Sequence, residues 1–148
     1  MKNISINISK STILNSVSLN SEYTGAKSTD PGKEYDRVAT VKEDEMLLTG
    51  FWLEICGLIS EKFKDLITKY EISDTMLNMK MELSNAFDDA LHASIVTDIT
   101  NAIVAGVTGR WFKVTAPEKS GEWLDNSNSL LNQATAKLYH RKKPIRRS

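Results

Sequence analysis

The first hydrophobic pattern in the chain is a strict alternation near its beginning. Isoleucine alternates with polar residues at Ile4, Ser5, Ile6, Asn7 and Ile8. A period of two places the isoleucines on one face, which is typical of a half-buried β-strand, and we expect a strand over residues 3–9. Residues 10–22 are ambiguous, because their apolar residues have helical spacing but their serines and asparagines disfavour a helix.

The strongest helical pattern lies in the middle of the chain. Apolar residues recur there at spacings of three and four, at Leu47, Leu48, Phe51, Trp52, Ile55, Ile59, Phe63, Leu66, Ile67 and Tyr70. This spacing predicts one long amphipathic helix over residues 41–70. Thr40 and Glu43 have the spacing of a capping box at its start. The preceding segment 23–39 contains several glycine, proline and serine residues and is expected to be a loop.

A second alternation and two more helical stripes follow. Leucine and methionine alternate with polar residues between Leu77 and Leu83, which predicts a second strand. A helix is expected to begin near Ser84 or Asn85 and to carry an apolar stripe that reaches Trp111. Pro117 suits the first turn of a last helix, whose stripe runs to Tyr139.

The helix that begins near Ser84 or Asn85 has small residues along its C-terminal half, at Ala102, Ala105, Gly106 and Gly109. A glycine inside a helix costs about 1 kcal/mol relative to alanine, so we expect close helix packing or a bend to compensate for that cost. Trp111 lies on the apolar stripe and is expected in the core, with Arg110 and Lys113 near the negative end of the helix dipole.

These patterns predict an α+β fold that is mainly α. It has a three-helix core with one long helix, together with two short strands. One domain is expected over residues 1–139, including the loop 23–39. Residues 140–148 then form a basic C-terminal tail, hereafter the basic tail.

Composition and charge are those of an ordinary globular domain. The chain has 148 residues, of which 41% are hydrophobic, and its 19 basic residues balance its 19 acidic ones. Five basic residues gather in the basic tail, at Arg141, Lys142, Lys143, Arg146 and Arg147. They can contact either nucleic-acid phosphates or an acidic protein surface, or form a solvated end. No signal peptide or membrane-spanning segment is expected.

Candidate catalytic chemistry is sparse. The chain shows no phosphate-binding loop, dinucleotide fingerprint or nucleophile elbow. His92 and His140 are interpreted as helix-end or surface residues, since one Asp/His pair near His92 lacks the ligands of a zinc site. Cys56, the single cysteine, is expected to be a buried hydrophobe, and no internal disulfide can form. We therefore expect no enzymatic activity, metal or cofactor.

A resemblance adds a functional expectation. The segment Gly109-Arg110-Trp111-Phe112-Lys113, the turn through Pro117 and the helix from Glu118 into Arg141 resemble head–tail connector (adaptor, or head-completion) proteins of tailed bacteriophages. Phe112 stands where that pattern usually carries a tyrosine. The segments 23–27, 36–37 and 142–144 are similar to small proteins encoded among the phage structural genes of gut bacteria.

The resemblance implies a subunit of a homo-oligomeric, dodecameric ring in the virion neck, made in the host cytoplasm. Such a ring contacts portal and tail or other neck proteins, gives packaged DNA a passage, and involves no membrane. Two alternatives stay open: a tail-completion or terminator protein, and a small nucleic-acid-binding regulatory protein that uses the basic tail.

Overall fold

The computed structural model describes residues 1–26 and 44–143. Along the chain the elements are β1 (Lys2–Ser9), α1 (Lys10–Ala26), α3 (Glu45–Lys62), β2 (Ile67–Ile72), β3 (Met76–Leu83), the 3-10 turn η2 (Asp89–Leu91), α4 (His92–Thr115) and α5 (Pro117–Leu138). The predicted α+β, mainly α, fold class is confirmed. Within the described residues there are four helices and three strands, one more of each than the sequence pattern indicated.

The three strands form one antiparallel sheet in the order β1-β3-β2. Both predicted strands are present, and their registers place Ile6 opposite Met79 and Ile4 opposite Met81. These side chains are buried, whereas Ser5 and Lys80 on the other face are exposed. The sheet thus has one apolar face against the helices and one polar face, as the alternation requires.

The predicted helix over residues 41–70 is wrong beyond Lys62. Helix α3 ends at Lys62, and the backbone N–H groups of Leu66 and Ile67 both donate to the carbonyl of Phe63 in a turn. The segment Ile67–Ile72 then becomes strand β2. This segment is rich in β-branched and aromatic residues, which favour a strand, and pairing with β3 outweighs the helical spacing. The predicted capping residues Thr40 and Glu43 lie outside the described residues.

Two other helix boundaries differ from expectation. The ambiguous segment after β1 is helix α1, which extends to Ala26 and so includes residues 23–26 of the expected loop. Helix α4 begins at His92 instead of Ser84, because two local caps form first: Ser84 Oγ accepts from the N–H of Ala86 at 3.1 Å, and Asp88 Oδ1 accepts from the N–H of Ala90.

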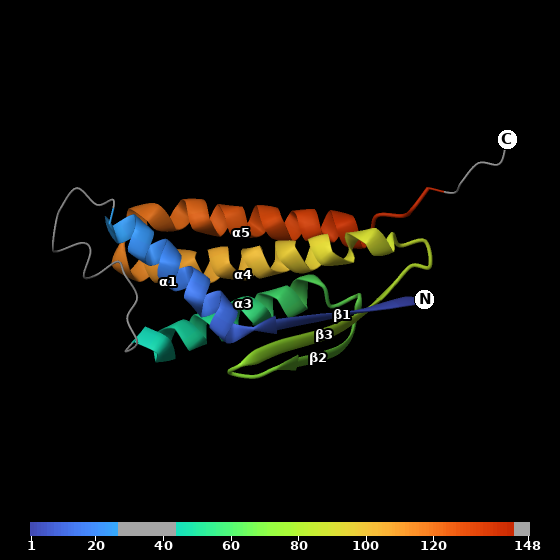
Figure 1. Cartoon of the computed structure of the whole chain (residues 1–148), viewed down its shortest axis with the longest axis horizontal. Helices are drawn as coiled ribbons and strands as arrows, with labels where there is room; N and C mark the ends of the chain where they lie inside the picture. The colour runs from blue at the N-terminus through green and yellow to red at the C-terminus, as the bar shows by residue number, and fades with distance from the viewer. Residues whose placement is uncertain (27–43, 144–148) are drawn as a thin grey trace.

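Helix α4 is the centre of the domain and contacts α1, α3 and α5 (Figure 1). The predicted close packing of its small residues is confirmed. An ideal Cβ on Gly106 would lie 2.8 Å from Ile55 Cδ1 of α3, and one on Gly109 would lie 2.8 Å from Leu124 Cγ of α5. Trp111 is buried as expected.

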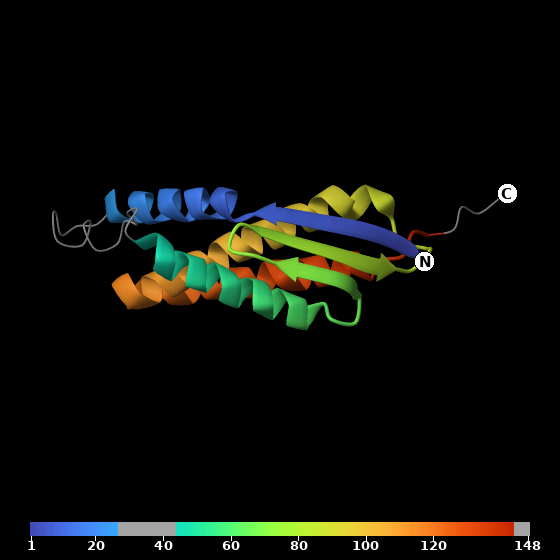
Figure 2. The same cartoon turned by 90° about the horizontal axis from the view of Figure 1, so that it is seen from below.

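The helices give the molecule two distinct long edges (Figure 2). Seen from the sheet side, α1 runs along one edge and α3 along the other, with α4 and α5 behind them. The sheet follows the same arrangement, since β1 lies on the α1 side and β2 on the α3 side. The N-terminus and residues 140–143 lie at the same end of the molecule (Figure 1).

Candidate assembly surfaces

The basic tail begins attached to the domain. Arg141 forms an isolated antiparallel bridge with Phe87, and the backbone N–H of Lys142 donates to the carbonyl of Ala86 at 2.7 Å. The side chains of Arg141, Lys142 and Lys143 are exposed. The predicted contact residues Arg146 and Arg147 lie outside the described residues.

A depression of about 400 Å³ lies beside this attachment. Leu66, Leu83 and Leu138 contribute apolar walls, and His140 and Arg141 contribute polar ones. Tyr139 also lines it and is 58% exposed, although its spacing suggested the apolar stripe. At the same end of the molecule Lys2 Nζ donates to the carbonyl of Phe87 at 2.9 Å. Phe87 therefore contacts both Lys2 and Arg141.

A second surface lies on the outer side of α3. We call the residues Met46, Gly50, Leu53 and Gly57 the α3 ridge. Their spacing of four, three and four places them on one face, opposite the buried side chains Leu48, Trp52, Ile55 and Ile59. Met46 is 88% exposed and Leu53 is 42% exposed.

The glycines of the α3 ridge have empty space in front of them. A Cβ built on Gly50 or on Gly57 would meet no atom within 4 Å. Leu47 and Leu58 flank the ridge and are 44% and 54% exposed. Leu47 was expected in the buried stripe, and its exposure corrects that interpretation.

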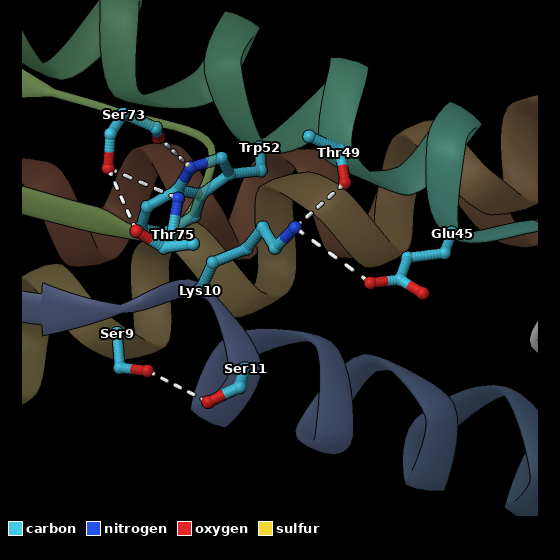
Figure 3. Close-up of polar contacts among 8 residues, drawn as sticks. All are labelled: Ser9, Lys10, Ser11, Glu45, Thr49, Trp52, Ser73 and Thr75. Carbon is cyan, nitrogen blue, oxygen red and sulfur yellow. Dashed lines mark hydrogen bonds and ion pairs between the residues drawn. The ribbon is translucent and has the colours of Figure 1, made fainter.

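Polar contacts on both sides hold α3 in this orientation. Lys10 Nζ, at the start of α1, donates to Thr49 Oγ1 at 3.1 Å, and its distance to Glu45 Oε1 is 4.0 Å (Figure 3). The indole N–H of Trp52 donates to the carbonyl of Ser73 in the β2–β3 turn at 3.2 Å (Figure 3).

On the α4 side of the helix, Arg110 Nη1 lies 2.6 Å from Glu54 Oε2. Arg110 therefore pairs with α3, where the sequence suggested only a favourable place near the end of α4. Together these contacts fix which face of α3 points outward.

Cys56 and His92 both have a place in the fold. Cys56 is fully buried, and this burial raises the pKa of its thiol to about 12, which leaves it protonated and unreactive near neutral pH. His92 Nε2 donates to the carbonyl of Ser5 in the edge strand β1 at 3.0 Å. Across residues 1–26 and 44–143, no three His, Cys, Asp or Glu side chains gather as metal ligands would.

Two further features concern α4. Lys137 of α5 lies 2.6 Å from Asp98, and its Nζ also donates to Ser94 Oγ, which ties α5 to α4. The segment Asp89–Thr115 is long and apolar enough to cross a membrane, with a mean hydropathy of 1.4, but half of its most apolar window is buried inside the domain. A central core helix has the same composition, so this is weak evidence for a membrane span.

Sequence reasoning found the basic residues but missed the α3 ridge. The signal was present, because the 4-3-4 spacing of the ridge is as regular as the buried stripe on the other side of the same helix. The buried stripe is longer and contains the aromatic residues, and it therefore dominated the interpretation. No protein-family model matches the chain, and neither a curated protein nor a solved structure matches it.

Proposed function

We propose that this protein is a structural subunit of a homo-oligomeric ring in the head-to-tail neck of a tailed phage. The resemblance of residues 84–143 to connector proteins supports the proposal. The observation that carries it is the α3 ridge with its flanking leucines, whose large apolar side chains are each more than 40% exposed in the described part of the chain.

The isolated chain leaves large apolar side chains of α3 exposed to water. Covering a large aliphatic side chain contributes about 1.5–3 kcal/mol relative to leaving it in water. Met46, Leu53 and Leu58 are all more than 40% exposed, so the isolated chain leaves much of this contribution unrealised. Contiguous exposed apolar surface of this kind marks contacts with other macromolecules. A structural subunit rather than an enzyme fits this distribution of residues.

The basic end supports a contact along the axis of such a ring. Arg141, Lys142 and Lys143 are exposed at the same end of the molecule as the N-terminus (Figure 1). In a neck, this end can face an acidic surface of the portal or a tail protein, or the phosphates of passing DNA. Attraction to either partner weakens with salt, so binding to DNA and binding to portal or tail proteins are measured separately.

The proposal is tested by producing the protein together with the portal and tail proteins encoded in the same phage genome. We expect it to co-purify with the portal as a ring and to be present in completed particles. A variant with Gln at Arg141, Lys142 and Lys143 should keep its helical circular dichroism and lose incorporation. Absence of the wild-type protein from particles, with no binding to portal or tail proteins, would contradict the proposal.

The second candidate is a small nucleic-acid-binding regulatory protein, and the same three exposed cations favour it. It predicts that the isolated monomer binds DNA tightly, with an affinity that falls steeply as salt increases. The neck proposal instead predicts weak binding by the monomer. A titration of labelled duplex DNA at several salt concentrations distinguishes the two.

A further inference from the structure

The consecutive cations of residues 141–143 have no carboxylate partner in the described part of the chain. Other basic side chains do have one, since Lys2 lies 3.0 Å from Asp89 and Arg110 lies 2.6 Å from Glu54. All three cations are exposed. In the isolated chain only water and salt neutralise them, so an anionic partner can supply the missing counter-charge.

The backbone that carries these cations is fixed against the domain. The N–H of Lys142 donates to the carbonyl of Ala86 at 2.7 Å, and Arg141 forms a bridge with Phe87. The carbonyl of Phe87 also accepts a hydrogen bond from Lys2 Nζ. The side chains of Arg141 and Lys142 therefore start from a positioned backbone, which lowers the ordering cost of binding a partner.

The depression of about 400 Å³ beside these cations, hereafter the end depression, is lined mainly by apolar side chains. They are Met1, Leu66, Leu83, Leu138 and Tyr139. Met1 and Tyr139 are 70% and 58% exposed, so this lining is accessible from solvent. Glu82 is the one carboxylate among the described lining residues, and Arg141 supplies a positive charge on the same wall. A concave apolar site with few polar groups is the usual form of a binding pocket.

An apolar hollow next to free cations favours a peptide over nucleic acid. A DNA duplex presents its phosphates on a convex surface, from which no large apolar group projects into a hollow. Single-stranded bases bind by stacking on aromatic side chains, and Tyr139 is the one aromatic residue among the described residues that line the end depression. A peptide can place an aliphatic or aromatic side chain among the leucines while its carboxylates meet residues 141–143.

We propose that the end depression binds an acidic peptide segment of a neighbouring neck protein, with one large apolar side chain of that segment inserted as an anchor. Carboxylates next to the anchor contact Arg141, Lys142 and Lys143. This inference rests on the proposed function, because it takes the partner from the portal or tail proteins. It specifies an acidic protein segment, and not DNA phosphate, as the partner of this end.

The probes are synthetic and are measured against the full-length protein. The first is a labelled peptide of glutamates with leucine and phenylalanine at its centre, the anchored peptide. The second has the same charge and two alanines at its centre, the alanine peptide. Labelled oligothymidine and duplex DNA represent nucleic acid. Fluorescence anisotropy gives the Kd of each probe.

Two sets of variants separate the anchor from the charges. Tyr139→Ser changes the lining at a residue that is 58% exposed, and Tyr139→Phe keeps the ring. A triple variant with Gln at residues 141–143 removes three charges. Its matched control carries Gln at Lys80, Lys113 and Lys119, which belong to no ion pair in the described part of the chain and do not line the end depression. Circular dichroism checks that every variant is folded.

We expect the wild type to bind the anchored peptide at least about tenfold more tightly than the alanine peptide. Tyr139→Ser should remove most of this difference, whereas Tyr139→Phe should keep it. The triple variant at residues 141–143 should weaken the binding of both peptides at least about tenfold. The matched control should change neither Kd by more than about twofold, because its charges lie elsewhere on the surface.

Three results would overturn the inference. Equal binding of the two peptides by the wild type would show that the end depression takes no anchor. Tighter binding of oligothymidine than of the anchored peptide, lost in Tyr139→Ser, would assign the depression to single-stranded nucleic acid. Equal losses in the triple variant and its matched control would leave only an effect of net charge.

Incorporation into particles tests the proposed function separately. A wild-type protein that is present in particles but does not prefer the anchored peptide contradicts this contact and leaves the neck subunit standing. Absence of the wild type from particles, with no binding to portal or tail proteins, contradicts the neck subunit whichever peptide binds.

Discussion

Replacing Gly109 with alanine tests the close contact between α4 and α5 on which the fold depends. The new Cβ would lie 2.8 Å from both Cγ and Cδ2 of Leu124 and 3.2 Å from its backbone nitrogen. Carbon atoms in contact prefer about 3.5–4.0 Å, so the overlap is severe. Rotation of the Leu124 side chain cannot relieve the contact with its backbone, and the two helices must separate.

The magnitude follows from two opposing terms. Overpacking a well-filled core costs about 1–3 kcal/mol, and the backbone overlap places this site near the upper value. Alanine recovers about 1 kcal/mol of helix propensity. The net loss of stability is therefore about 2 kcal/mol, which lowers Tm by roughly 4–8 °C in a domain of this size.

The matched control is Gly50→Ala, because nothing lies within 4 Å of its new Cβ. It should stabilise the monomer by about 1 kcal/mol and raise Tm by roughly 2–4 °C. The assay is thermal unfolding followed by circular dichroism, at a protein concentration low enough to keep both variants monomeric. If Gly109→Ala raises Tm as much as Gly50→Ala does, the helices are not packed as closely as described and the reasoning is refuted.

Three further predictions concern the core. The pKa of Cys56 is raised to about 12 in the fold from 9.0 in the unfolded chain, so between these pH values the thiol ionises only in the unfolded chain. The stability advantage of wild type over Cys56→Ala, measured by urea unfolding, should therefore shrink from pH 9 to pH 12. A constant difference would show an accessible thiol. Lys137→Ala leaves the largely buried Asp98 without its partner and should cost about 3 kcal/mol, whereas Lys119→Ala, whose lysine is in none of the described ion pairs, should be nearly neutral by the same measurement. Trp52→Ala removes a fully buried side chain and its hydrogen bond to Ser73, and should lower the free energy of unfolding by about 3–5 kcal/mol. An unchanged Tm would show that Trp52 does not lie on the buried face of α3.

Much of the fold could be predicted from the sequence where one periodic pattern was present. The strands β1 and β3 alternate without ambiguity, and Pro117 marks the start of α5 at the residue where that helix begins. The small residues of α4 correctly indicated close packing, since an added Cβ on Gly106 or Gly109 would lie 2.8 Å from a side chain of a neighbouring helix.

The remainder required tertiary information. The apolar residues between Phe63 and Tyr70 fit a helix and a strand equally, and only pairing with β3 decides for β2. The late start of α4 depends on side-chain caps at Ser84 and Asp88 that compete locally with the helix. These choices depend on neighbours distant in sequence, which periodicity alone does not contain.

The candidate surfaces could also be predicted from the sequence only in part. The cations at Arg141, Lys142 and Lys143 are evident from composition, although their attachment to Ala86 and Phe87 is not. The spacing of the α3 ridge is present in the sequence, but the structure is needed to show that it faces outward, because Met46 and Leu53 are as apolar as residues in the core.

The most direct test of self-assembly is native mass spectrometry of the wild-type protein over a range of concentrations. The account predicts that the 16.6 kDa chain converts, as concentration increases, into one closed oligomer whose mass is a fixed whole multiple of the subunit, with a dodecamer expected from the resemblance. A wild-type protein that remains a 16.6 kDa monomer at every concentration, or an open series of ever larger species, would contradict the closed ring.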